Sequence, residues 1–288
     1  MPLHLGPYEL TTIDDGRFAL DGGAMFGTVP RVLWERSNPP DGQNRIGMAL
    51  RTLLVRGGGR TILVDTGLGD KFSEKQRAIY RVERRGGVLA GLSSLGLGPE
   101  DVTDVLVTHL HFDHGGGGTR RDGAGVLVPA FPVARYHVQE ENLAVASVPN
   151  ERERASYLPE NLQPLRDAGC LVVHSGGYEL APGIEILLSH GHTRGMQMVL
   201  VSAPGSATVC YPSDLIPTSS HLRIPWVMGY DLWPLTVMEE KKALLERAVR
   251  EGWVLIFEHD PSVAACTVNF DGKNFGAGPT VDTGELRL

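Results

Sequence analysis

Residues 108–118 read THLHFDHGGGG, and this stretch decides how the whole chain is interpreted. Four side chains that can ligate a metal, His109, His111, Asp113 and His114, fall within six consecutive positions. Imidazole nitrogens and carboxylate oxygens are ligands that a borderline divalent ion such as zinc accepts in proteins. The glycines that follow allow the backbone to pass close to a charged centre and to begin a helix beside it. The stretch therefore predicts a metal site.

An apolar run at 102–107 leads directly into this motif, and three other apolar runs also end in a metal-ligating residue. In α/β architectures, functional residues gather at one end of the strands, where the loops converge. We therefore expect these strand ends to meet in one pocket. The three runs and the residues that follow them are 184–188 with His192, 207–211 with Asp214, and 253–257 with His259.

These ligands divide into two groups, because neighbouring side chains in a loop can turn toward different centres. The predicted cofactors are two divalent metal ions, zinc by default, with iron, manganese or cobalt as alternatives. Both ions keep open positions for water, as a catalytic site requires. The predicted ligands are His109, His111 and His192 for one ion, Asp113, His114 and His259 for the other, and Asp214 as a bridge that gives one oxygen to each.

Short apolar runs rich in β-branched residues predict strands, and most are apolar throughout, which is typical of strands covered on both faces. Layers of helix outside paired sheets follow from this pattern. The clearest helix is expected at 238–251, where Thr236 and Glu239 have capping-box spacing. Two more are expected at 88–95 and at 151–168, the second interrupted by prolines. The predicted strands are 52–55, 61–64, 102–107, 133–138, 184–188, 198–201, 207–211 and 253–257.

Composition and charge narrow the class of protein. No internal repeat or linker-like cluster divides the chain, so residues 1–288 are expected to form a single domain, with 71–87 as a candidate mobile flap. The net charge of −7 and the absence of a basic stripe argue against a nucleic-acid partner. The chain lacks a signal-peptide pattern and a membrane-spanning apolar stretch, which predicts a cytoplasmic protein without membrane contact. The oligomeric state is left open, a homodimer being one option.

A family resemblance comes from several motifs in a fixed order. From Leu53 to Val268 the chain resembles the metallo-β-lactamase superfamily. The resemblance implies an α+β fold, a four-layer αβ/βα sandwich of two mixed sheets flanked by helices, with a metal cleft at one edge. It also implies that Asp65, in the stretch ILVDTG, lies under the site as a supporting carboxylate, whereas the residues alone are equally consistent with a turn cap. The motifs are HLHFDHGGG at 109–117, SHGHTRG at 189–195, PSD at 212–214 and FEHD at 257–260.

Departures from the patterns of known branches narrow the implied function. True metallo-β-lactamases of the main class carry Cys where Asp214 stands, and the oxygen-reducing branch carries Glu where His111 stands. The RNA-processing branch needs a basic recognition arm. What remains is similar to the branch of N-acyl homoserine lactonases, glyoxalase II-like thioesterases and organophosphate hydrolases. Lactonases usually place a Tyr shortly after the bridging Asp, where Leu215 follows here, and this argues against strict lactone specificity.

The predicted function is hydrolysis of a small-molecule ester, lactone or thioester. Two cations can lower the pKa of a bridging water from about 15.7 toward about 7, so that hydroxide is present at neutral pH. Asp113 or Asp214 is expected to accept its proton, and His221 and Tyr230 are expected to donate to the developing oxyanion. Phosphotriester hydrolysis on the same site is the alternative. A non-catalytic metal-binding protein of the same fold is a third possibility.

Other side chains carry weaker signals. His190 precedes His192 by two positions but is not expected to be a ligand. The loop 219–231 is the predicted substrate wall, in which Trp226 and Met228 suggest an apolar acyl or aryl pocket together with the nearby Trp233. Structural or surface positions are expected for His4, His137 and His174.

Overall fold

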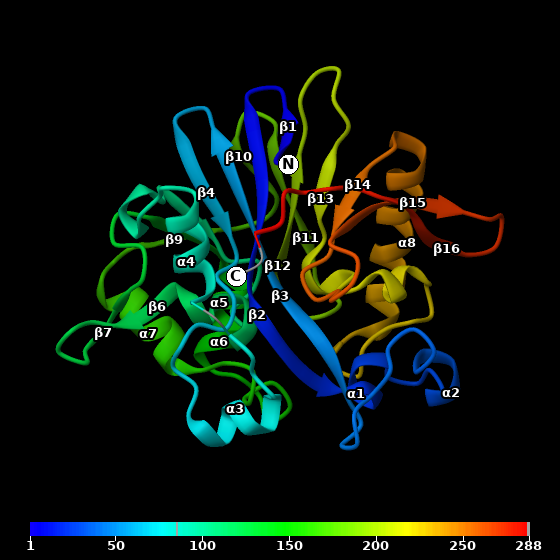
Figure 1. The fold of residues 1–288 in the computed structure, drawn as a ribbon, viewed down its shortest axis with the longest axis horizontal. Coiled ribbons are helices and arrows are strands. Elements are labelled where there is room, and N and C mark those ends of the chain that lie inside the picture. The colour runs from blue at the N-terminus through cyan, green and yellow to red at the C-terminus, as the bar shows by residue number, and fades with distance from the viewer. Residues whose placement is uncertain (85, 287–288) are drawn as a thin grey trace.

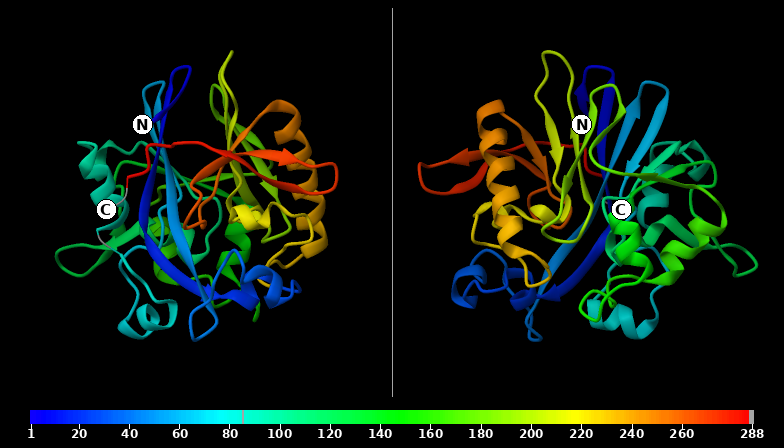
Figure 2. Two further views of the ribbon diagram at one scale, coloured as in Figure 1. Left: turned by 45° about the vertical axis from the view of Figure 1, so that its right-hand side comes forward. Right: turned by 180° about the vertical axis from the view of Figure 1, so that it is seen from behind.

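Two seven-stranded mixed sheets pack face to face in the computed structural model, which describes residues 1–84 and 86–286. Helices cover the outer face of each sheet, as the two views of Figure 2 show. The expected α+β sandwich of two mixed sheets flanked by helices is therefore confirmed. The space between the sheets is filled by apolar side chains from both, among them Leu53, Val64, Val199 and Ile256.

The first sheet has the order β1-β2-β3-β4-β5-β8-β9 (Figure 1). Its first four strands are antiparallel neighbours, and β4, β5, β8 and β9 pair in parallel. The parallel strands bring the end of β5, and the motif after it, to one edge of the sandwich. The strands are β1 Leu3–Leu5, β2 Tyr8–Asp21, β3 Arg45–Gly57, β4 Arg60–Val64, β5 Asp104–Leu106, β8 Arg135–Gln139 and β9 Leu171–His174.

The second sheet has the order β10-β11-β12-β13-β14-β15-β16, and β13 and β14 form its parallel pair. That pair places the loops after β13 and β14 side by side, at the edge where β5 also ends. All the predicted strands are present across the two sheets. The strands are β10 Tyr178–Ala181, β11 Ile184–Ser189, β12 Met196–Val201, β13 Val209–Tyr211, β14 Val254–Ile256, β15 Ala265–Phe270 and β16 Phe275–Thr280, and a separate hairpin pairs β6 Thr119–Arg121 with β7 Leu127–Pro129.

The helices bury apolar stripes against the outer faces of the sheets. Val88 and Leu92 of α4 pack beside strand residues of the first sheet, and Leu244 and Leu245 of α8 pack on the second. The α-helices are α1 Gly22–Phe26, α2 Arg31–Trp34, α3 Glu74–Tyr80, α4 Gly87–Ser94, α5 Phe112–Gly115, α6 Glu140–Ser147, α7 Pro159–Asp167 and α8 Pro234–Glu251. Short 3-10 turns are η1 Pro99–Asp101, η2 Gly116–Gly118, η3 Ser213–Leu215 and η4 Ser219–Leu222.

Two helix predictions need correction. Helix α8 begins at Pro234, four residues before the predicted start, and its N-cap Trp233 has no side-chain cap, so the predicted capping box of Thr236 and Glu239 is wrong. Proline at the first helical position needs no such cap, because its missing N–H would have had no partner in the helix. In the range predicted at 151–168, only α7 is helical, and residues 151–156 form turns.

The predicted flap contains a short, well-anchored helix. Ser73 and Gln76 form a capping box at the start of α3. At its other end, Arg45 of β3 donates to the carbonyl oxygens of Ala78 and Ile79, at 3.0 and 2.9 Å. Arg85, in the same predicted flap, lies outside the described residues. Among the helices of the described chain, none has the length and apolarity needed to span a membrane.

Candidate metal centre

The motif 108–118 is held where it is by the turn that follows β4. Thr66 donates from its backbone N–H and its hydroxyl to the carbonyl oxygen of His114, at 2.7 and 2.9 Å. The glycine loop then packs directly on this turn, so that a Cβ added at Gly117 would lie 2.1 Å from the oxygen of Thr66. Only glycine allows such a close approach of two backbones. The glycines after the motif thus fix the position of the helix α5, which carries Asp113 and His114.

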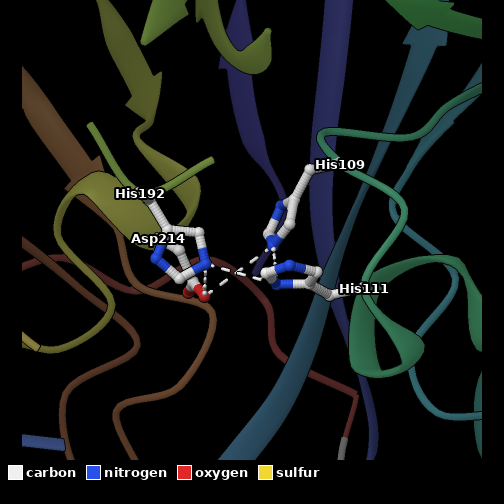
Figure 3. A group of neighbouring side chains, drawn as sticks. All are labelled: His109, His111, His192 and Asp214. Carbon is white, nitrogen blue, oxygen red and sulfur yellow. Dashed lines mark hydrogen bonds and ion pairs between the residues drawn. The ribbon is translucent and has the colours of Figure 1, made fainter. Parts of the chain in front are cut away.

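The first predicted ligand group comes together at the edge of the sandwich. His109, His111, His192 and Asp214 each offer a ligand atom within 4.8 Å of the others, and Figure 3 shows their side chains converging. His109 Nε2 and His192 Nε2 lie 3.0 and 3.3 Å from His111 Nδ1. All four side chains are buried. The structure therefore brings together residues that are up to 105 positions apart in the chain.

The second predicted group lies beside the first and shares the Asp214 carboxylate with it. Asp113, His114 and His259 also offer ligand atoms within 4.8 Å of one another. The Oδ2 atom of Asp214 lies 3.2 Å from His192 Nε2, and its Oδ1 atom lies 3.2 Å from His259 Nε2. Oδ2 also lies 3.5 Å from His114 Nε2, so the Asp214 carboxylate contacts histidines of both groups, as expected of a bridging carboxylate.

Hydrogen bonds on the outer side of three histidine rings fix which nitrogen of each ring faces the centre. His192 Nδ1 donates to Asp231 Oδ1 at 2.9 Å, and His259 Nδ1 donates to the carbonyl oxygen of Ala49 at 2.9 Å. His114 Nδ1 lies 3.1 Å from Asp65 Oδ2 and 3.0 Å from a Glu258 oxygen. A ring proton on the outer nitrogen leaves the inner nitrogen as an acceptor. When one of these rings is neutral, its inner nitrogen therefore carries a lone pair that faces the centre.

This arrangement fits divalent cations. The Nε2 atoms of His114 and His259 lie only 3.3 Å apart. Asp214 Oδ1 is buried and has no hydrogen-bond partner among the described residues. With both rings neutral, these buried acceptors would face one another without a donor between them, which is costly, whereas a cation between them would satisfy them all. The donor set of imidazoles and carboxylates is one that zinc, iron, manganese and cobalt accept.

Burial and neighbouring carboxylates shift the pKa values of these histidines in opposite directions. Burial lowers the pKa of His109 and His111 well below the ordinary value, so both rings are neutral and able to ligate. Burial has the same effect on His259, but the adjacent Asp214 carboxylate outweighs it and raises the pKa of His259 to about 9. Protons and cations therefore compete for the Nε2 atom of His259.

A pocket of about 250 Å³ opens over the two groups. Asp113, Asp214 and Tyr230 line this pocket, and Tyr230 has 39% of its surface exposed. Burial raises the pKa of Tyr230 to about 12, so its hydroxyl remains a donor at neutral pH. Leu20, Met25, Phe112, Met228 and Leu232 form the apolar part of the wall.

His221 has a structural position, and its predicted role as an oxyanion donor needs correction. Its Nε2 donates to the carbonyl oxygen of Met25 at 2.8 Å, and its Nδ1 lies 2.7 Å from the hydroxyl of Thr218. The ring is stacked on Phe26 at 4.8 Å and is only 1% exposed. Both nitrogens are thus engaged away from the pocket. Trp226 packs against the same Phe26 ring.

Other predictions for single residues can be placed as well. Asp65 accepts from the backbone N–H and the hydroxyl of Thr108, both at 2.7 Å, and so supports the motif from below, as the resemblance implies. His190 lies 3.1 Å from Glu141 and belongs to neither ligand group. Trp233 lies under the guanidinium of Arg194 at 4.0 Å and does not line the pocket.

Sequence reasoning missed the supporting roles of Asp231 and Glu258. Glu258 had a usable signal, since it directly precedes His259, a predicted ligand. Asp231 had none, because it lies 39 positions from His192 and follows no motif. Its contact depends on the path of the loop 219–231 across the site.

Comparison with known proteins decides the family. Residues 51–259 match the family model described as the metallo-beta-lactamase superfamily. The chain belongs to this superfamily. A relative in Bacillus cereus named N-acyl homoserine lactonase is 24% identical over 212 residues, which cover 69% of this chain and 76% of the relative. Other metallo-beta-lactamase relatives are named lactonases or metallo-hydrolases, and the chain is a hydrolase of this superfamily.

Solved structures agree with this fold. A probable metal-dependent hydrolase from Staphylococcus aureus is 27% identical, with a TM-score of 0.88, and the match covers 97% of this chain and 100% of that one. The dizinc quorum-quenching lactonase AidC, solved with the product N-hexnoyl-L-homoserine, is 22% identical with a TM-score of 0.79, over 98% and 97% of the two chains. At this identity the second likeness shows the metallo-beta-lactamase fold alone.

Proposed function

We propose that this protein is a dinuclear metal-dependent hydrolase that cleaves an ester, lactone or thioester of a small molecule. The observation that carries the proposal is that the Asp214 carboxylate lies within 3.5 Å of histidines from both candidate ligand groups. Zinc is the metal proposed first. Two such cations would supply a hydroxide nucleophile at neutral pH and would polarise the bond to be cleaved.

Residues of the chain would then transfer the proton and exclude water from the substrate. Asp113 and Asp214 both line the pocket, and either carboxylate would accept a proton and return it to the leaving group. The side chains of Phe112, Met228 and Leu232 would exclude water around an apolar substituent of the substrate. The complete set of predicted ligands argues against a non-catalytic protein of the same fold.

A metal-exchange assay tests this proposal. The protein is stripped with a chelator, reloaded with zinc, and assayed on a lactone, a thioester, an aryl ester and a phosphotriester. We expect hydrolysis of carbonyl substrates that disappears on stripping and returns on reloading. A preference for the phosphotriester would show that the protein is a phosphotriester hydrolase instead. Reloaded protein that turns over none of the four would refute the proposal.

Tyr230 is proposed to donate a hydrogen bond to the substrate. Tyr230 lines the pocket together with Asp113 and Asp214, and no described residue accepts from its hydroxyl. A hydrogen bond of this kind contributes about 0.5–1.5 kcal/mol, so Tyr230→Phe is expected to lower kcat/KM by up to about tenfold. Metal content should not change. Tyr8→Phe, which removes a hydroxyl bonded to the carbonyl oxygen of Pro182, is the control; equal kinetics for the two variants would exclude the role.

A further inference from the structure

The loop between α6 and α7 forms one wall of the metal pocket. Four of its residues, Arg152, Glu153, Ala155 and Ser156, line this pocket. Asn150 fixes the start of the loop, because its side-chain oxygen accepts from the backbone N–H groups of Arg152 and Glu153, at 2.9 and 3.1 Å. The wall is therefore built on a defined turn and presents two neighbouring charged side chains in a fixed orientation.

Glu153 anchors this wall to the residue that follows His192. Its side chain is buried, with 5% exposed, and its Oε1 accepts from the hydroxyl of Thr193 at 3.1 Å. Its Oε2 accepts from the Asn150 amide at 2.6 Å. Thr193 is also within 2.9 Å of the Tyr157 hydroxyl, from the end of the same loop. The loop therefore holds Thr193, the residue immediately after the predicted metal ligand His192.

Arg152 reaches in the other direction, to the residue that orients His192. Its guanidinium donates to the carbonyl oxygens of Gly229 and Asp231, at 2.6 and 3.1 Å. The Asp231 carboxylate accepts from His192 Nδ1 through one oxygen and from the backbone N–H of Met228 through the other. The Arg152 guanidinium therefore binds the backbone of Asp231, and the side chain of Asp231 orients the His192 ring.

We propose that Arg152 is a positioning residue, which holds His192 in its ligating orientation through Asp231. The inference rests on the proposed function. A planar guanidinium can bind two carbonyl oxygens at once with little further ordering, which suits it to fixing a surface loop. Ligands of a catalytic metal must stay within about 0.5 Å of their productive positions. Without the Arg152 bonds, the Gly229–Asp231 stretch would lose its link to the opposite wall, and the His192 ring would lose a fixed support.

Arg152→Ala tests this inference, with Arg154→Ala as a matched control. Arg154 lies in the same loop and is exposed, but it contacts Glu151 and does not line the pocket. We expect Arg152→Ala to lower kcat/KM about tenfold and to speed zinc loss to a chelator about tenfold, in line with the effect of residues that support metal ligands. The thermal midpoint should stay close to wild type, because the side chain is exposed. Arg152→Lys should restore part of both losses.

Asp231→Ala removes the direct contact with His192. It should therefore lower kcat/KM and speed zinc loss more than Arg152→Ala does. If Arg152→Ala and Arg154→Ala retain zinc and activity equally while wild type holds two ions, the inference is overturned and the proposed function stands. Wild-type protein that binds no zinc would overturn both.

Discussion

Asp214→Asn is expected to lose most of its bound metal and almost all of its hydrolytic activity. The Asp214 carboxylate contacts histidines of both candidate ligand groups, and an asparagine cannot offer an anionic oxygen to each. Metal ions stabilise charge in the transition state by several kcal/mol, and each factor of ten in rate corresponds to about 1.4 kcal/mol. A fall in kcat/KM on the order of a thousandfold or more is therefore expected, measured on the best substrate of the panel.

An exposed aspartate supplies the control for this change. Asp167→Asn, at the end of α7, alters the same functional group far from the pocket and should leave metal content and rate unchanged. Circular dichroism should confirm that both variants are folded. If Asp214→Asn kept the wild-type metal content and rate, the two clusters would not act as one centre.

Arg51→Met is expected to destabilise the fold by about 3–5 kcal/mol, the usual cost of breaking a buried ion pair. The Arg51 side chain is fully buried and pairs with Glu285, whose side chain is 8% exposed. It also donates to the carbonyl oxygens of Phe257 and Asp260, the latter at 3.1 Å. These two carbonyls flank Glu258 and His259, so Arg51 secures the loop that carries the predicted ligand His259. Urea unfolding followed by tryptophan fluorescence measures the loss.

The same strand offers a matched surface pair. Arg56 of β3 pairs with Glu9, and both side chains are about one-third exposed. Exposed ion pairs contribute about 0–1 kcal/mol, so Arg56→Met should fall within that range. Similar losses for the two variants would mean that Arg51 does not anchor the 257–260 loop.

The convergence of the candidate ligands could be predicted because their signals are local. They lie in the segments that follow β5, β11, β13 and β14, and the structure brings these segments together. Asp231 and Arg51 could not be predicted in the same way. Arg51 contacts Phe257 across 206 positions, and only the folded sheets bring these residues together.

The errors have physical causes as well. Strand β2 was missed because its apolar run is broken by polar residues that the structure buries, such as Thr12, which shares a hydrogen bond with Thr283 at 2.7 Å. The role predicted for His221 assumed a free ring nitrogen, but Met25 and Thr218 engage both. A sequence pattern indicates which groups can donate, and the folded chain decides which of them are already bonded.

Metal stoichiometry tests the central claim most directly. Mass spectrometry of metals in protein purified without chelators should give close to two zinc-like ions per chain, and His114→Ala should lower this number. A ratio near zero after zinc loading, or an unchanged ratio in His114→Ala, would show that these buried histidines and carboxylates do not bind a pair of cations.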